Sequence, residues 1–180
     1  MFPSHDLGLK NLFYTYQEGE GGIATALSLA RPHIRNGEDV VVILGDNYFE
    51  KGIGPQVSAF KLRQKFLQGA SCVLRKTDTP WHFGIAEVTD DKIASIEEKP
   101  SEPKSDLAIL GCYFFDCQLW DIVNTVEPSA RGETEITDVL RAYNKMGLLG
   151  YSTYDGYWSD MGTFPTWMEV SKRIEGRCAP

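Results

Sequence analysis

The feature that most restricts the fold is an unbroken apolar run, Val40-Val41-Val42-Ile43-Leu44. A run this short and this uniformly apolar is typical of a strand that helices cover on both faces. Upstream, apolar residues recur at three- and four-residue spacing from Ile23 to Ile34, which predicts a helix that ends near Asn36-Gly37. The aromatic segment 11–17 predicts a strand before that helix. Strand, helix and strand in this order predict a right-handed parallel crossover.

Beyond the apolar run, helical and strand-like patterns continue to alternate. The further predicted strands are 70–74, a hairpin of 83–88 and 92–97 around Thr89-Asp90-Asp91, and 107–115. The further predicted helices run through Phe60, Leu62 and Phe66, from Thr134 through Val139, Leu140 and Tyr143, and from Thr163 through Met168, Val170 and Ile174. We therefore expect one α/β domain over residues 1–180, in which the hairpin and segment 107–115 form a second, antiparallel layer.

Charge and hydropathy exclude several classes of protein. The 18 Lys and Arg residues against 25 Asp and Glu give a net charge of -7, whereas a nucleic-acid groove needs a basic surface to neutralise phosphates. No apolar run approaches the roughly 20 residues that span a bilayer, and the first residues do not resemble a signal peptide. We expect a cytoplasmic protein that binds neither nucleic acid nor membranes.

A carboxylate follows the apolar run, in Leu44-Gly45-Asp46-Asn47. Open α/β sheets bind ligands beyond the carboxyl ends of their strands, so Asp46 could hold a divalent cation there. The same tetrapeptide is also an ordinary turn, because Asp and Asn are common turn residues. Taken alone, the tetrapeptide favours the turn.

Three other segments offer polar groups at element ends. Glu98 and Lys99, in Ile96-Glu97-Glu98-Lys99-Pro100, could bind sugar hydroxyls and a phosphate, although exposed Glu-Lys pairs are more often solvated surface charge. Segment 158–163, Trp-Ser-Asp-Met-Gly-Thr, places Asp160 before a helix, where it is either a metal ligand or part of a helix start. Gln17 precedes a glycine-rich turn that could let backbone approach a base, or could merely turn the chain.

Taken in order, the motifs resemble the sugar-1-phosphate nucleotidyltransferase family, and within it the glucose-1-phosphate thymidylyltransferases. The resemblance runs from about Leu7 to about Ile174. It rests on Tyr14-Thr15-Tyr16-Gln17, Gly22-Ile23-Ala24, Leu44-Gly45-Asp46-Asn47, Phe83-Gly84, Glu97-Glu98-Lys99-Pro100, Gly111-Cys112-Tyr113-Phe114-Phe115-Asp116, Arg131-Gly132-Glu133-Thr134-Glu135-Ile136-Thr137-Asp138 and Trp158-Ser159-Asp160-Met161-Gly162-Thr163.

The resemblance implies a partial Rossmann-like fold of the nucleotide-diphospho-sugar transferase type. It also implies that the phosphate of a sugar 1-phosphate attacks the α-phosphorus of a nucleoside triphosphate and releases pyrophosphate, with Mg²⁺ as cofactor. The implied catalytic residues are Asp46 and Asp160, which would share the metal, and Lys99, which would hold the sugar phosphate. The implied substrate-binding residues are Gln17, Gly22 and Ile23 for the base, and Gly84, Glu98, Ile109, Thr137 and Trp158 for the sugar.

One family motif has no counterpart here, the loop GGxGTRL that wraps the triphosphate in family members. The resemblance therefore implies an N-terminally truncated member, and either a homo-oligomer or a partner chain that supplies the loop. The alternative to an enzyme is a noncatalytic homologue that serves as a sugar-phosphate-binding or assembly module.

Overall fold

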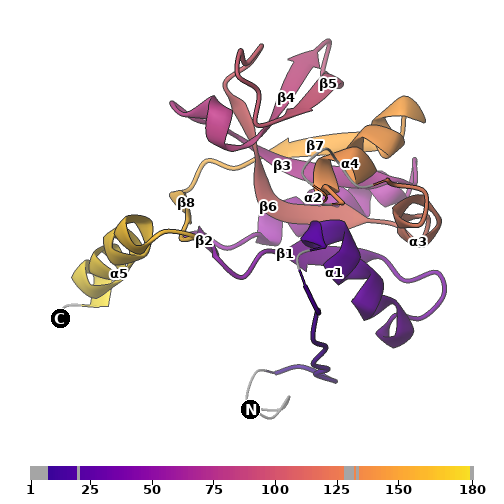
Figure 1. Ribbon diagram of the computed structural model, residues 1–180, viewed down its shortest axis with the longest axis horizontal. Helices are drawn as coiled ribbons and strands as arrows, with labels where there is room; N and C mark the ends of the chain where they lie inside the picture. Colours follow the sequence, from indigo (N-terminus) through magenta and orange to yellow (C-terminus); the bar gives the residue numbers. More distant parts are fainter. Residues whose placement is uncertain (1–7, 20, 128–131, 133, 179–180) are drawn as a thin grey trace.

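The computed structural model describes residues 8–19, 21–127, 132 and 134–178 (Figure 1). Its helices are α1 (Gly22–Ala30), α2 (Gly54–Gln64), α3 (Leu119–Val123), α4 (Ile136–Lys145) and α5 (Phe164–Cys178), with 3₁₀ turns at Arg31–His33 and Pro80–His82. Its strands are β1 (Val40–Ile43), β2 (Asn47–Phe49), β3 (Ala70–Lys76), β4 (Gly84–Thr89), β5 (Lys92–Glu98), β6 (Leu107–Phe115), β7 (Leu149–Thr153) and β8 (Trp158–Asp160). None of the described helices is both long and apolar enough to cross a bilayer.

The longest strand, β6, organises a six-stranded mixed sheet. One edge of β6 pairs antiparallel with β3, which in turn pairs parallel with β7. The other edge of β6 pairs antiparallel with two different strands, with β4 at Ala108 and with β1 from Cys112 to Phe115. Residues 109–111 therefore lie between the ends of β4 and β1, and this is where the candidate site forms.

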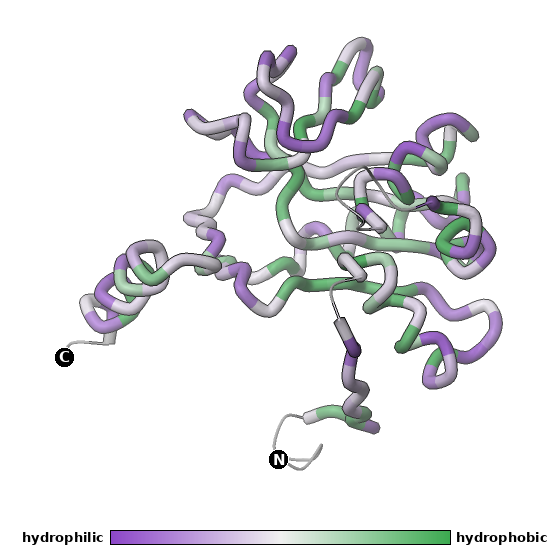
Figure 2. The backbone as a smooth tube through the Cα atoms, viewed as in Figure 1, coloured by the Kyte–Doolittle hydropathy of each residue, from purple (hydrophilic) through white to green (hydrophobic). Residues whose placement is uncertain are grey.

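Alternate side chains of β6 point to opposite faces of the sheet, and each face has its own apolar cluster. On one face, Tyr113 and Phe115 pack with α1, α3 and α4. On the other, Leu110, Cys112 and Phe114 pack with Phe60 of α2. Figure 2 shows the resulting concentration of hydrophobic residues along the central strands. The mixed sheet flanked by helices agrees with the predicted α/β class.

The structure corrects the predictions for the N-terminal part. Segment 11–17 forms no strand, because no described strand lies beside it, and its aromatic rings are exposed. The helix that the sequence predicts to continue to about Asn36 ends instead at Ala30, and a 3₁₀ turn that contains Pro32 follows it. β1 pairs antiparallel with β6, so there is no parallel crossover into it. Val41 and Ile43 are 45% and 51% exposed, so one face of β1 is open instead of covered.

Two further predictions need correction. The hairpin β4–β5 and strand β6 belong to the main sheet, because β4 pairs with β6, and the small antiparallel sheet is instead β2–β8. Helix α2 buries Phe60, but Leu62 and Phe66 are exposed, and Phe66 lies beyond the helix end. Strands β3 and β6, the hairpin and helix α4 lie where the sequence predicts them. Thr163 caps α5 as predicted, because the Thr166 N–H donates to its Oγ1 at 3.4 Å.

The buried cysteines give a direct test of this packing. Burial raises the pKa of Cys72 and of Cys112 to about 12, so both stay as unreactive thiols near neutral pH. Cys117 is exposed. We expect iodoacetamide at pH 8 to alkylate Cys117 within minutes and to reach Cys72 and Cys112 only after unfolding, as peptide mapping would show. Rapid labelling of Cys112 in the folded protein would contradict the packing of β6.

Candidate functional site

Two segments far apart in the sequence meet in the ribbon of β2 and β8. The ribbon has three antiparallel residue pairs, with Asn47 opposite Asp160 at one end and Phe49 opposite Trp158 at the other. At the first end, the Met161 N–H donates to the Asp46 carbonyl oxygen at 2.7 Å. The ribbon thus places Asp46 and Asp160 side by side, the two residues that the family resemblance pairs as metal ligands.

The gap between these two carboxylates is kept open by Gly162. A Cβ on Gly162 would lie 2.9 Å from Asp160 Oδ1 and 3.6 Å from Asp46 Oδ2, so both carboxylates border the same space. Each has one oxygen held in place: the Asn47 amide donates to Asp46 Oδ1 at 2.9 Å, and the Gly162 N–H donates to Asp160 Oδ1 at 2.7 Å.

This pair suits one kind of metal ion. Among the described residues, no three His, Cys, Asp or Glu side chains come together as a metal cage. Mg²⁺ does not need such a cage, because it is commonly bound by one or two carboxylates together with waters and substrate phosphates. Zn²⁺, which favours four nitrogen or sulfur ligands, does not fit.

Next to the carboxylate pair lies a polar cavity of about 170 Å³. It occupies the gap beside residues 109–111 of β6, between the ends of β1 and β4. Its lining includes Lys99, predicted for the sugar phosphate, and Gly84, Glu98, Ile109 and Trp158, predicted for the sugar. It also includes Ile23, predicted for the base, and Asp160 of the carboxylate pair. Asp46 itself is not part of this lining.

Asn47 is the main site residue that the sequence reasoning missed. Its Oδ1 accepts hydrogen bonds from the Gly111 N–H at 3.0 Å and from Trp158 Nε1 at 2.8 Å. It therefore joins β6, β8 and Asp46, and it fixes the indole as one wall of the cavity. Phe83 completes that wall, with its ring centroid 5.4 Å from that of Trp158 in edge-to-face geometry. The sequence signal was present, because Asn47 lies inside the tetrapeptide that drew attention to Asp46.

Lys99 has an unusual backbone. Its φ is +43°, a left-handed conformation that is uncommon for a residue other than Gly, Asn or Asp, and the following Pro100 would favour extended backbone. The Lys99 N–H donates to the Phe83 carbonyl at 3.0 Å, which closes the end of the hairpin. Strained backbone of this kind is concentrated at functional sites.

Two buried groups lie at the cavity, Tyr113 in its lining and Thr137 behind it. Burial, and then the charge of Glu98, raise the pKa of Tyr113 far above its usual range, so this hydroxyl is a neutral hydrogen-bonding group. Thr137, a predicted pocket residue, is only 2% exposed and lies behind the wall instead of in it. A Cβ on Gly84 would lie 2.8 Å from Thr137 Cγ2 and 3.2 Å from Glu98 Oε2. Thr137 therefore supports Gly84 and has no direct access to the cavity.

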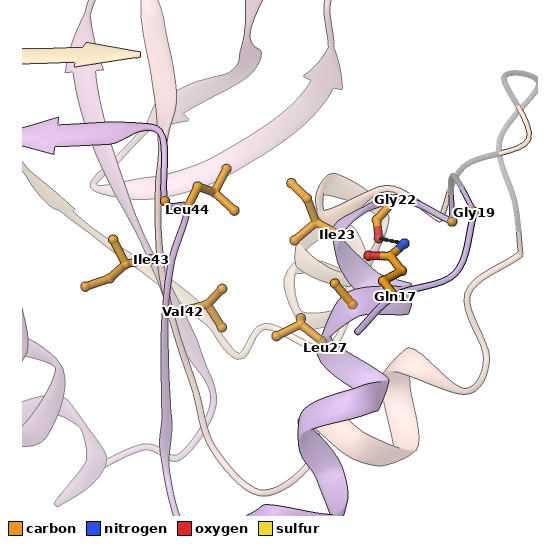
Figure 3. Close-up of a pocket in the computed structure, with 11 residues that line it drawn as sticks. Gln17, Gly19, Gly22, Ile23, Leu27, Val42, Ile43 and Leu44 are labelled. Carbon is orange, nitrogen blue, oxygen red and sulfur yellow. Dashed lines mark hydrogen bonds between the residues drawn. The ribbon is translucent and has the colours of Figure 1, made fainter. Parts of the chain in front are cut away.

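A second cavity, of about 490 Å³, adjoins the first and shares Ile23 and Leu44 with it. It lies between β1 and the start of α1, and the three residues predicted for a base, Gln17, Gly22 and Ile23, line it (Figure 3). Gly22 has φ +76°, and a Cβ there would lie 2.7 Å from the Thr134 carbonyl oxygen, so only glycine fits. Of the quoted motif around Thr134, Arg131 and Glu133 lie outside the described residues.

Comparison with known proteins gives consistent results. The profile of the nucleotidyl transferase family matches residues 5–177. A glucose-1-phosphate thymidylyltransferase of Streptomyces antibioticus is 34% identical over 91% of this chain and 46% of its own length. One of Mycolicibacterium smegmatis is 36% identical over 92% of this chain and 57% of its own. The chain thus spans about half the length of these relatives.

A solved structure is also similar. A crystal structure from Bacillus anthracis, assigned as a glucose-1-phosphate thymidylyltransferase, superposes with a TM-score of 0.85 at 40% identity. The superposition covers 94% of this chain and 67% of that one.

Proposed function

Because the chain belongs to the nucleotidyl transferase family, we propose that it carries the sugar-phosphate and metal sites of a glucose-1-phosphate thymidylyltransferase. The reaction joins glucose 1-phosphate to the α-phosphate of thymidine triphosphate and releases pyrophosphate. The observation that supports this most is the single cavity that gathers Gly84, Glu98, Lys99 and Trp158 beside the Asp46–Asp160 pair. Residues 1–180 would form one domain of this type.

In this proposal the 170 Å³ cavity binds the sugar 1-phosphate. Glu98 would accept hydrogen bonds from sugar hydroxyls, and the Gly84 backbone would bind a further one. The Lys99 ammonium would neutralise the sugar phosphate and hold its oxygen in line for attack. Trp158 and Ile109 would pack against the apolar face of the ring.

Asp46 and Asp160 would hold Mg²⁺ through the carboxylate oxygens that face the gap at Gly162. When bound, the metal would neutralise charge on the reacting phosphates, which is the main requirement of phosphoryl transfer. Asn47 would keep Asp46 oriented through its 2.9 Å hydrogen bond. No side chain has to act as a nucleophile.

The second cavity would take the base, with Gln17 offering amide groups to its edge. Among the described residues, those that line this cavity include no lysine or arginine. The cations that neutralise the triphosphate would therefore come from elsewhere, from a further segment or from another subunit of a homo-oligomer. Without them, the chain would act as a sugar-phosphate-binding module.

Two measurements on the purified chain test the proposal. Calorimetry should show binding of glucose 1-phosphate in the presence of Mg²⁺, and Lys99→Ala should abolish it, whereas Lys104→Ala, which removes an exposed lysine from the following loop, should not. Pyrophosphate release with thymidine triphosphate would then show a complete enzyme. Binding without release would show the module, and no Lys99-dependent binding would contradict the proposal.

The predicted role of Gly84 can be tested by adding a single methyl group. In Gly84→Ala the new Cβ would press on Thr137 Cγ2 and Glu98 Oε2, and small displacements of positioning groups are costly. We expect the dissociation constant of glucose 1-phosphate to rise about 10- to 100-fold. Gly54→Ala is the control, because a Cβ there meets no atom within 4 Å. Equal affinities for both variants would contradict the placement of Glu98 in the sugar site.

A further inference from the structure

The carboxylate pair depends on a short ribbon whose hydrogen bond to β6, from the Gly111 N–H to Asn47 Oδ1, lies at the end next to the carboxylates. β2 and β8 share three residue pairs, and neither belongs to the six-stranded sheet. The ribbon is extended at its far end by the Glu50 N–H, which donates to the Tyr157 carbonyl at 3.0 Å. A two-stranded ribbon of this size is not stable by itself. Asn47 holds the carboxylate end against β6, and the far end needs contacts of its own.

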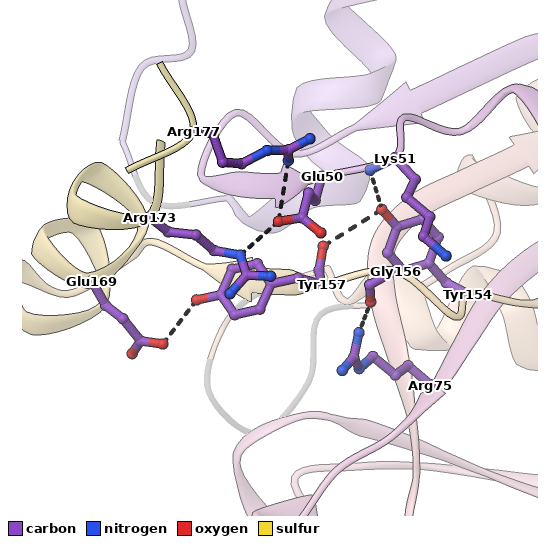
Figure 4. Close-up of polar contacts among 9 residues, drawn as sticks. All are labelled: Glu50, Lys51, Arg75, Tyr154, Gly156, Tyr157, Glu169, Arg173 and Arg177. Atoms are coloured by element: carbon purple, nitrogen blue, oxygen red, sulfur yellow. Dashed lines mark hydrogen bonds and ion pairs between the residues drawn. The ribbon is translucent and has the colours of Figure 1, made fainter. Parts of the chain in front are cut away.

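Helix α5 supplies side chains to that far end (Figure 4). Arg173 Nε donates to Glu50 Oε1 at 2.6 Å, and Arg177 Nη1 lies 3.1 Å from the same oxygen. The Arg173 guanidinium also lies over the Tyr157 ring, 4.1 Å from its centroid. The Tyr157 hydroxyl in turn donates to Glu169 Oε1 at 2.9 Å. These five residues, the Glu50 cluster, connect both strands of the ribbon to one helix.

The Glu50 cluster matters because α5 has little else to hold it. Among the residues of α5 whose burial is described, only Val170 is fully buried, and Figure 1 shows the helix extending away from the sheet. Isolated surface ion pairs contribute little, but here two arginines converge on one carboxylate whose side chain is only 16% exposed. The hydrogen bond from Arg173 lowers the pKa of Glu50, which keeps it ionised near neutral pH.

We propose that the Glu50 cluster is a positioning device for the metal pair: by fixing α5 to the far end of the β2–β8 ribbon, it sets the separation of the Asp46 and Asp160 carboxylates. Glu50 follows Asp46 by one short strand, and Tyr157 precedes Asp160 on the opposing strand. A change at the cluster is therefore transmitted along both strands to the carboxylates. The inference rests on the proposed function, since it concerns the proposed metal site.

The test is Mn²⁺ binding, measured by electron paramagnetic resonance on the whole chain, because Mn²⁺ suits the same oxygen ligands as Mg²⁺. Glu50→Gln should weaken Mn²⁺ about 10-fold, as loss of outer-shell support commonly does. Arg173→Gln, which removes the donor to the same carboxylate and the cation over the Tyr157 ring, should weaken Mn²⁺ to a similar extent. Lys51→Gln is the matched control, since Lys51 pairs instead with the exposed Asp155.

Three results would contradict the proposal. If Glu50→Gln lowers the melting temperature but leaves the Mn²⁺ dissociation constant unchanged, the cluster is merely structural and the proposal fails. Weakening by Glu50→Gln that Arg173→Gln does not reproduce would also overturn it. If the parent chain shows no Mn²⁺ binding that Asp46→Asn abolishes, the metal site itself is wrong, and the proposed function fails together with this inference.

Discussion

Under the proposed function, replacing Asp160 with asparagine should reduce Mg²⁺-dependent pyrophosphate release by about 10²- to 10³-fold, the usual cost of removing one charge-stabilising group from a transition state. The substitution keeps the shape of the side chain and an oxygen that can still accept the Gly162 N–H. What it removes is half of the negative charge that faces the proposed ion. Steady-state assays of pyrophosphate release, with Mn²⁺ binding measured in parallel, would check it.

A neighbouring aspartate offers a matched control. Asp155→Asn makes the same change in net charge on the loop before β8, but that side chain is exposed and its partner is Lys51. It should leave turnover and Mn²⁺ affinity within a factor of about two, because exposed ion pairs contribute little. Similar losses in both variants would mean that overall charge, and not the carboxylate pair, is responsible.

The candidate site residues came from the family resemblance, whereas the strands and helices were predicted from local sequence patterns. Asp46 and Asp160 are 114 positions apart and no local pattern joins them; family resemblance paired them, and the β2–β8 register brings them together. Neither strand of that ribbon was predicted, because three residues carry too little pattern to separate a strand from a turn. Asn47 was missed as a hydrogen-bonding centre for the same reason, since its partners Gly111 and Trp158 become neighbours only through tertiary structure.

The errors in the sheet have physical causes. Strand β1 is uniformly apolar, which suggested burial on both faces, yet within the described chain one face of it is open. Segment 11–17 has strand-forming aromatics but no strand to pair with, and β propensity alone does not provide a hydrogen-bonding partner. Strand β7 carries Gly150 and three hydroxyl-bearing residues, so its pattern resembles a loop, and only its parallel pairing with β3 reveals it. Long strands with many apolar residues, such as β6, were predicted correctly.

The largest effect on stability should come from replacing Gly69, the residue immediately before β3, with alanine. Its φ is +147°, a conformation that is essentially restricted to glycine, and a Cβ there would overlap the Leu148 carbonyl oxygen and lie 2.9 Å from Leu148 Cβ. Leu148 cannot move away, because its carbonyl accepts hydrogen bonds from the Ala70 N–H at 3.0 Å and from Arg63 at 2.8 Å. Gly69→Ala should therefore combine backbone strain with overpacking, for a loss of about 4 kcal/mol.

A loss of this size is a large part of the 5–15 kcal/mol that stabilises a typical domain, and should lower the melting temperature by roughly 10 °C. Two glycines separate the causes. Gly147 has φ +71° with no atom near a Cβ, so Gly147→Ala should show backbone strain alone, about 1 kcal/mol. Gly54 has neither strain nor neighbours, so Gly54→Ala should be nearly neutral. Urea denaturation of the three variants should give losses in the order Gly69, Gly147, Gly54. If Gly69→Ala instead loses no more stability than Gly147→Ala, backbone strain is the whole effect. Leu148, which immediately precedes β7, would then have room for the added methyl group.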